Sequence, residues 1–463
     1  MIQTRSSAVA VKGTTRLKVK HRIGRGDRMT TKRWLPVERW LVVGGVAAAC
    51  ALGVTVARSN VLALFLALLA AFVCLALFAT RLGPTVVLLP ALLIPVNAMT
   101  SRSVGLIPLG PAISLSVFLG AMCLPGPRNG PLARLGFLAL GCMGAGEILA
   151  YIAAGSARSP LAELQFLLVW AAGLTVGVVM ARKPQAVDIL IWVVATLAAL
   201  AVFELASGPN PWVLVLQASR YTATTAGIVR STSSFGHPLI AGDIFAVVAL
   251  LAIGRKGALR WVAGPLLIMG VISTVSRSSA IGLLVGLIAY VVWLPEYRSR
   301  VATLVVPLGS LLILAGFLFS PLRQSIEGRV LSSDYQQVTR QATIGRIMTD
   351  IENRPQALLL GGGIGSTQIQ LTNVGGIGGV DALDNQFATS IYDIGLIPSL
   401  ASYGLLIAIA SIASRRRSTV GPALFCGLVT MAFSDSLYWH SFGVLLWLIV
   451  GLAASCENPR EAI

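Results

Sequence analysis

Long stretches without charged residues recur along this chain, and they constrain its fold more than any other feature. The segment Val61–Thr80 contains 20 residues and no charge, which is long enough for a helix to cross the hydrocarbon core of a bilayer. Segments of similar character recur to the C-terminus, about 14 in all by length and apolar content. Together with 56% hydrophobic and 12% charged residues, they predict an all-α, polytopic transmembrane helical bundle of about 12–14 spans.

The apolar segments lie on both sides of one long polar break. The expected spans are 40–57, 61–80, 84–98, 111–124, 133–154, 164–181, 187–205, 238–254, 261–275, 279–294, 301–320, 391–413, 419–435 and 440–455. Two of them, 84–98 and 111–124, are short for a full crossing, and removing such a pair leaves the sidedness of the rest unchanged. The predicted domains are an N-terminal basic arm (1–39), the first part of the bundle (40–320), a large loop (321–390) and C-terminal helices with a short tail (391–463).

The distribution of Lys and Arg indicates on which side of the membrane each loop lies. Cytoplasmic loops favour these residues, and the first 40 residues carry 11 of them against Asp27 and Glu38. With the N-terminus in the cytoplasm, all six lysines and most arginines, including Arg415–Arg417, fall in the arm, the tail or inward loops. We therefore expect a multi-pass protein of the cell inner (plasma) membrane whose loop 321–390 is extracytoplasmic.

The net charge of +18 also bears on partners. Anionic lipid headgroups explain a basic surplus that lies in the arm and in inward loops, so membrane lipids are expected partners and nucleic acid is not. The six cysteines are scattered in or beside apolar segments without a CxxC pair. They indicate small core residues and predict neither metal ligands nor disulfides.

Two short polar islands interrupt apolar stretches on the predicted outer side. The first, Arg230–Pro238, lies where a shorter outer loop re-enters the membrane, and the second, Ser273–Ser279, lies between two spans. An arginine at such a position is costly unless it pairs or lines a wet cavity. For Arg230 the alternative is an interfacial anchor that snorkels. For Arg277 in the second island, Asp243 is a candidate countercharge.

The long loop carries the third island. Its first part, Pro321–Arg354, has the apolar spacing of an amphipathic helix that stops at Pro355. Glycine-rich turns follow, of which Gly361–Gly365 is either a flexible turn or a backbone amide nest for phosphate. Such a loop predicts a lid over a site. Where the loop rejoins the bundle, at Asp384–Gly395, Asp384 is either a base or a helix N-cap.

In this order and on one face, these segments resemble the O-antigen ligase and O-antigen polymerase superfamily of bacterial membrane glycosyltransferases, over roughly residues 160–440. The resemblance rests on Arg230–Pro238, on Thr274–Arg277 at a span boundary, on Arg346 with Pro355 leading into Gly363–Gly365, and on Asp384-Asn385 spaced from Gly395. Ligases of this family have histidine where this chain has Asp384. That departure favours a polymerase, or a ligase whose acceptor is not lipid A.

The resemblance implies a donor, an acceptor and a mechanism. The donor is a polyprenyl-pyrophosphate-linked glycan, the acceptor is a glycan or lipid-linked glycan, and neither metal nor cofactor takes part. Arg230 and Arg277 stabilise the departing pyrophosphate, for which the planar guanidinium is suited. Asp384 orients or deprotonates the acceptor. The substrate-binding candidates are Arg346, His237 and Asn385.

Several other polar residues have simpler explanations. Interface placement accounts for Asp188 and Glu204, whereas Glu147 is nearer the middle of its span and is a candidate for a polar cavity wall. Asp435 and His440 lie near the last outer turn, where turn chemistry explains the aspartate.

A different class of function also fits many spans with basic inner loops. A transporter or lipid-linked-glycan flippase usually places its polar groups at the membrane midplane and has two related halves. No internal repeat is visible here, and the polar groups gather at one outer mouth. A structural membrane subunit would not need two arginine-bearing islands and an arginine-bearing loop on the same outer side. The sequence therefore favours an enzyme.

Overall fold

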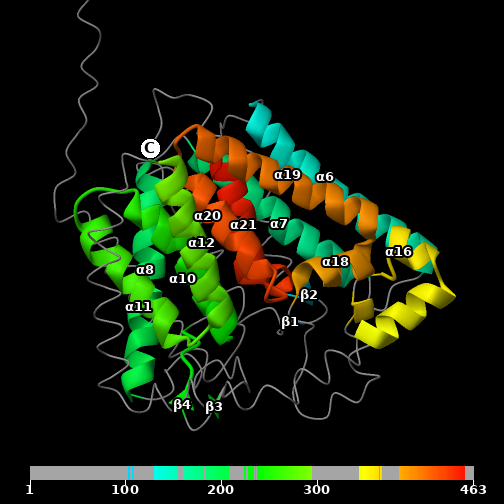
Figure 1. Cartoon of the computed structure of the whole chain (residues 1–463), viewed down its shortest axis with the longest axis horizontal. Coiled ribbons are helices and arrows are strands. Elements are labelled where there is room, and N and C mark those ends of the chain that lie inside the picture. The colour runs from blue at the N-terminus through cyan, green and yellow to red at the C-terminus, as the bar shows by residue number, and fades with distance from the viewer. Residues whose placement is uncertain are drawn as a thin grey trace, which may run out of the picture. The chain divides into compact units, whose positions relative to one another are not determined.

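The structure is a computed structural model, and Figure 1 shows its architecture. Apart from residues 234, 236 and 364 and four two-residue strands, it describes residues 130–154, 160–181, 184–207, 230–294, 344–367 and 385–453. The predicted basic arm, the first four spans, the span 301–320 and most of the loop 321–390 lie outside the described residues.

Helices make up nearly all of the described chain. They are α6 (Pro131–Ala154), α7 (Pro160–Met180), α8 (Pro184–Ser207), α10 (Pro238–Ile253), the π-helical turn η1 (Leu259–Ala263), α11 (Gly264–Ser273), α12 (Arg277–Trp293), α16 (Gln356–Leu360), α18 (Gln386–Ile394), α19 (Leu396–Arg415), α20 (Val420–Met431), the 3-10 turn η3 (Ser436–Tyr438) and α21 (His440–Leu452). Residues 344–353 are also helical. Two antiparallel ladders pair β1 (Ser103–Val104) with β2 (Ile107–Pro108) and β3 (Thr224–Thr225) with β4 (Ile228–Val229).

Three of the described helices are long and apolar enough to cross a membrane: Pro131–Ala153, Gln185–Leu205 and Leu396–Arg415. Six shorter apolar helices of 10–17 residues accompany them. Large apolar side chains also point outward on the long helices, and Ile152 on α6 is 74% exposed. The predicted class, a helical membrane protein, agrees with these helices.

The predicted spans agree with the described helices to within a few residues, with one correction. The apolar run predicted as a single span at 391–413 is two helices, α18 and α19, separated at Gly395. Gly395 has φ 96°, in the region that favours glycine, and a Cβ there would meet the backbone of Leu359 and Leu360. The break places α18 beside the glycine-rich loop, outside the long helix.

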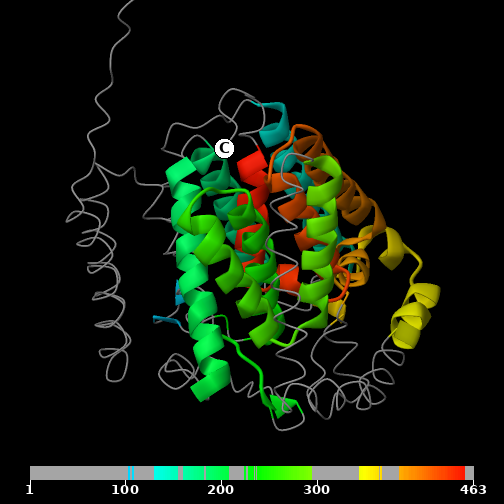
Figure 2. The same ribbon diagram turned by 60° about the vertical axis from the view of Figure 1, so that its left-hand side comes forward.

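Helix α21 lies in the interior, where it contacts α6, α7, α10 and α20. Figure 2 shows it in red among the other helices. Its packing against α7 depends on glycine: a Cβ at Gly173 would meet the carbonyl oxygen of Val444, and one at Gly177 would meet that of Leu448. The spacing Gly173-x-x-x-Gly177 is the small-residue pattern that lets membrane helices approach closely.

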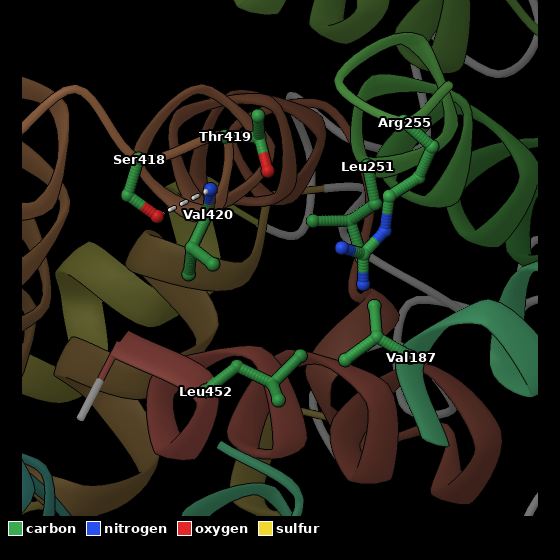
Figure 3. A pocket seen from close by; sticks show the side chains of 7 residues that line it. All are labelled: Val187, Leu251, Arg255, Ser418, Thr419, Val420 and Leu452. Atoms are coloured by element: carbon green, nitrogen blue, oxygen red, sulfur yellow. Dashed lines mark hydrogen bonds between the residues drawn. The ribbon is translucent and has the colours of Figure 1, made fainter. Parts of the chain in front are cut away.

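The bundle has two chemically different ends. At one end, which we call the basic end, α8 begins, α10 ends and α20 begins. There Arg255 forms an ion pair with Asp188 (2.9 Å). A shallow pocket with about 280 Å³ of empty space, open solvent included, lies at this end. In Figure 3 the guanidinium of Arg255 points toward Val187 at this pocket. The opposite end, which we call the site end, carries the polar islands.

Candidate functional site

The Arg230 segment contacts the Ser273–Ser279 segment directly. The Nε of Arg230 donates to the carbonyl oxygen of Thr274 at 3.0 Å. The backbone N–H of Ser231 donates to the carbonyl oxygen of Ser273 at 3.3 Å. Arg230 is buried, with 6% of its surface exposed. The first two predicted islands therefore meet in space, although 44 residues separate the two partners of the arginine bond. In Figure 1, β4, which precedes Arg230, lies at the lower end of α10.

The carboxylate of Glu204, near the end of α8, holds the chain that follows Arg230. It accepts hydrogen bonds from the backbone N–H groups of Thr232 (3.0 Å) and Ser233 (2.8 Å) and from the Thr232 hydroxyl (3.2 Å). Glu204 is 2% exposed, so its role is to fix this segment, which interface placement did not predict. Burying a carboxylate is costly unless it is hydrogen-bonded, and these bonds meet that requirement.

Two residues in these segments have left-handed backbone conformations. Ser233 and Val275 both have φ 50°. This region is uncommon for residues other than glycine, and a β-branched residue such as valine is an outlier there. Such conformations persist only where the surrounding structure enforces them, and they cluster at functional sites. The strain thus occurs beside both candidate arginines.

Arg277 is the first residue of α12 and is exposed. The N-cap is Ser276, whose hydroxyl accepts from the backbone N–H of Ser279 at 3.3 Å. Because a helix N-terminus carries partial positive charge, an anion near Arg277 meets the guanidinium and the helix dipole together. This is the kind of position that a phosphate-binding arginine requires.

The predicted pairing of Asp243 with Arg277 is wrong in the described structure. Asp243 is fully buried in α10. Its Oδ1 accepts from the Ser279 hydroxyl at 2.6 Å, and its Oδ2 accepts from the Ser434 hydroxyl at 3.0 Å. The physical reason is that hydroxyls from two other segments surround the carboxylate, while Arg277 points away from the core.

The described part of the third island begins with Asn385. This residue is the N-cap of α18, and its side-chain oxygen accepts from the backbone N–H of Ala388 at 3.1 Å. The N-cap role that was considered for Asp384 therefore belongs to its neighbour. Asp384 itself lies outside the described residues, so its role as a base stays a prediction.

The 434–437 segment, between α20 and α21, joins the islands. Asp435 accepts from the Thr389 hydroxyl at 2.9 Å, and the backbone N–H of Leu437 donates to the Gln386 side chain at 3.0 Å. Both partners lie on α18. The first residue of the segment also donates to the carboxylate in α10, as described above. One short turn thus connects the second island to the third.

His237 caps α10 and is held in its neutral form. Its Nδ1 accepts from the backbone N–H of Leu239 at 3.2 Å, which requires an unprotonated nitrogen. Burial, and then the charge of Arg230, lower the pKa of His237 from 6.5 to about 4. Its ring lies 5.1 Å from that of Trp439. At neutral pH the ring therefore brings no charge to the site.

The glycine-rich loop is fastened to the end of α18. The carboxylate of Asp393 accepts from the backbone N–H groups of Gly365 (3.1 Å) and Thr367 (2.9 Å) and from the Thr367 hydroxyl (2.8 Å). The N–H of Gly362 donates to the carbonyl oxygen of Tyr392 at 2.7 Å. In this structure the amides of Gly362 and Gly365 are therefore bonded to α18, which disfavours the phosphate-nest reading.

Arg346 is exposed on the helical residues 344–353. The same helix is tied to α18 because Tyr392 donates its hydroxyl to Asp350 at 2.6 Å, and Asp350 also pairs with Arg354 at 2.5 Å. Partial burial alone would raise the pKa of Asp350, but the hydrogen bonds from Arg354 and Tyr392 lower it. The helix stops before Pro355, as its sequence predicts.

The site contains residues that the sequence reading underestimated. Glu204, Asp393 and the 434–437 segment hold the islands in place through bonds that span 26 to 191 residues. A buried acid in an apolar run was the available signal for Glu204. Asp393 lay inside the predicted third island without a role of its own. Glu147, named as a polar cavity wall, is 3% exposed in α6.

Among the described residues, no group of three or more His, Cys, Asp or Glu side chains is placed to hold a metal ion. No family model and no curated protein matches the sequence.

Proposed function

We propose that this chain is a membrane glycosyltransferase that transfers or polymerises polyprenyl-pyrophosphate-linked glycans on the extracytoplasmic face. One observation carries the proposal. The two arginine-bearing segments bond to each other through Arg230 and Thr274, and the 434–437 segment links the second of them to α18. The Arg230 segment, the Ser273–Ser279 segment and α18 thus lie together at one end of the bundle.

The proposed membrane arrangement follows from the same grouping of segments. We place the site end outside the cell inner membrane and the basic end, with Lys256 and Arg415–Arg417, in the cytoplasm, because inward loops favour Lys and Arg. The whole chain then forms about 12–14 spans, with the loop 321–390 over the site as an extracytoplasmic domain. The lipid tail of the donor stays in the bilayer while its sugar reaches the site from outside.

In the proposed reaction an acceptor hydroxyl oxygen attacks the anomeric carbon of the donor sugar. The new carbon–oxygen bond forms while the bond to the polyprenyl pyrophosphate breaks, and the pyrophosphate leaves with the electron pair. The hydroxyl proton passes to the carboxylate of Asp384. Charge grows on the leaving phosphate oxygens, so a fixed cation aimed at them lowers the barrier. Arg277, exposed at a helix N-terminus, is the first candidate for that cation.

The remaining residues support this geometry. Arg230 orders the loop beside Arg277 through its bond to Thr274 and adds a second positive charge. Neutral His237 can donate one hydrogen bond without changing the charge of the site. Asn385 fixes the start of α18, directly after Asp384. Arg346, exposed on the loop helix, is in a position to meet donor phosphate when the loop covers the site.

The test is a glycan analysis of a strain that lacks the chain, complemented with wild type, Arg277→Ala or Asp384→Ala. Envelope glycans and the lipid-linked pool are sized together. We expect both variants to lose long glycan chains. Single-repeat lipid-linked units accumulating outside would establish a polymerase, and long lipid-linked chains without an acceptor would establish a ligase.

The same experiment addresses the transporter reading. Precursor that accumulated only on the cytoplasmic side would contradict the enzyme and favour a flippase. A matched control is Asp188→Asn, which changes a carboxylate at the basic end, where it pairs with Arg255. We expect this control to make glycan of wild-type length.

A further inference from the structure

Asp243 connects two segments of the site through its two carboxylate oxygens. Oδ1 accepts from Ser279 in α12, and Oδ2 accepts from Ser434 after α20. The packing around it is close, because a Cβ on the neighbouring Gly242 would meet the side-chain oxygens of Ser279 and Thr274. The carboxylate is fully buried, so substrate does not reach it in this structure.

On one side the hydrogen bonds lead to Arg277. The Ser279 hydroxyl that binds Asp243 is also 2.7 Å from the hydroxyl of Ser276, which caps α12. The cap determines where the helix begins, and Arg277 is the next residue along the chain. The position of the guanidinium therefore depends on a chain of three side chains that starts at Asp243.

On the other side the bonds lead to α18. Ser434 is followed by Asp435, which binds Thr389, and by Leu437, whose N–H binds Gln386. Asn385 caps the start of α18, and Asp384 precedes it in the sequence. Asp243 thus links the Ser273–Ser279 segment, which carries Arg277, to the start of α18.

A buried carboxylate inside an apolar bundle is costly, even when hydroxyls satisfy it. Replacing both partners of a buried hydrogen bond by apolar groups of the same shape is often nearly neutral for stability. Stability alone therefore does not explain a buried carboxylate at position 243. Its hydrogen bonds to Ser279 and Ser434 offer another explanation, because they fix the distance between the two segments.

We propose that Asp243 is a positioning residue that sets the distance between Arg277 and the start of α18. This inference rests on the proposed glycosyl transfer, because the two groups act on opposite ends of the reacting bond: one on leaving phosphate and one on the attacking hydroxyl. Small displacements of catalytic groups reduce rates strongly, by about 100-fold for about 1 Å. Asp243 thus affects the rate of transfer without contacting substrate.

The experiment compares Asp243→Ala with Asp243→Asn in purified protein, using a polyprenyl-pyrophosphate-linked oligosaccharide as donor. Alanine removes both hydrogen bonds. Asparagine can keep both, because its amide accepts at one end and donates at the other, and a serine hydroxyl can be either partner. We expect kcat to fall about 100-fold for alanine and about threefold or less for asparagine, with KM nearly unchanged in both.

Ser279→Ala and Ser434→Ala are the matched variants in case Asp243→Ala does not fold. Each removes one bond and leaves the carboxylate in place, and each should lower kcat with little change in KM. If all variants that fold keep the wild-type kcat while Arg277→Ala is inactive, the positioning role is wrong and the proposed function stands. If Arg277→Ala is itself active, the role given to Arg277 is wrong, and if the wild-type chain transfers no glycan from this donor, the proposed function falls.

A second measurement does not depend on activity. The Arg277→Cys variant is labelled with a membrane-impermeant thiol reagent, with and without Asp243→Ala, against the background of the chain's own cysteines. We expect the labelling rate at position 277 to change severalfold when the carboxylate is removed, because the start of α12 is released. An unchanged rate would overturn the inference.

Discussion

At the scale of single residues, the site is held together by buried carboxylates that accept hydrogen bonds from distant parts of the chain. Glu204 binds the loop after Arg230, and Asp393 binds the glycine-rich loop. Each gains two backbone N–H groups and one hydroxyl, which is close to what a buried carboxylate needs.

The arginine at position 277 gives the first prediction. If bidentate contact with phosphate oxygens is the reason for an arginine there, Arg277→Lys should fail almost as badly as Arg277→Ala, because lysine presents a point charge without the planar fork. The measurement is the amount of long-chain glycan at normal expression. Full-length glycan from the alanine variant would contradict the assignment, and full activity of lysine alone would contradict the bidentate argument.

His237 gives a prediction about pH. Its pKa in the folded protein, about 4, lies below the ordinary 6.5. The unfolded chain therefore binds the proton more readily, and the stability that the neutral ring contributes is present above about pH 6.5 and lost as pH falls toward 4. We expect the thermal unfolding midpoint in detergent to fall between pH 7 and pH 5. The fall should be smaller in His237→Asn, which titrates no group at this position.

Two substitutions of His237 distinguish the contribution of the N-cap from that of the charge. His237→Asn should keep the cap of α10, because asparagine is a favoured N-cap residue. His237→Leu removes the acceptor and should lower the free energy of unfolding at pH 7 by about 1 kcal/mol. Equal stability of the two variants at pH 7 would show that the cap contributes little.

At the scale of helices, the sequence predicted what local composition controls and missed what distant contacts control. The bounds of α6, α8 and α10 agree with the predicted spans 133–154, 187–205 and 238–254 to within a few residues, because these runs are mostly apolar. The break at Gly395 was missed because the residues on both sides are apolar, so hydropathy stays high through it. Its signal is the glycine alone, which the close approach of Leu359 and Leu360 requires.

The same distinction between local composition and distant contacts applies to the candidate site. Arg230 and Arg277 were found because an arginine beside an apolar run is conspicuous, and the structure brings their segments together. The 434–437 segment was explained as a turn because Ser and Asp are ordinary turn residues. Its partners Asp243 and Thr389 lie 191 and 46 residues away. Nothing in the local sequence indicates such bonds.

The packing of α7 on α21 gives a prediction at this scale. Gly177→Ala would place a methyl group against the carbonyl of Leu448, so we expect a loss of about 1–3 kcal/mol in stability from overpacking. The matched control is Gly404→Ala in α19, where a Cβ would meet nothing within 4 Å. There alanine should be neutral or stabilising by up to about 1 kcal/mol, as expected inside a helix. Unfolding midpoints in detergent compare the two, and equal effects would contradict the packing argument.

At the scale of the whole molecule, the candidate site and the cluster of basic residues lie at opposite ends of the described helices. The carboxylates that hold the islands and the two candidate arginines lie at the site end, whereas Lys256, Arg415–Arg417 and the Arg255–Asp188 pair lie at the basic end. A helix of 20 residues such as α19 is about 30 Å long, which matches the hydrocarbon core of a bilayer. The proposed reaction requires the site end to face outward, because the donor glycan is presented there.

Cysteine labelling on either side of α19 tests this orientation. Ala388, on α18, and Arg416, after α19, are both exposed and lie before and after the long helix. With a membrane-impermeant thiol reagent, Ala388→Cys should be labelled in intact cells with a permeable outer layer, and Arg416→Cys only after the inner membrane is opened. The parent chain, with its own cysteines, provides the background. The reverse pattern would place the arginines in the cytoplasm, where an extracytoplasmic donor cannot reach them, and the proposed glycosyl transfer would have to be abandoned together with the orientation.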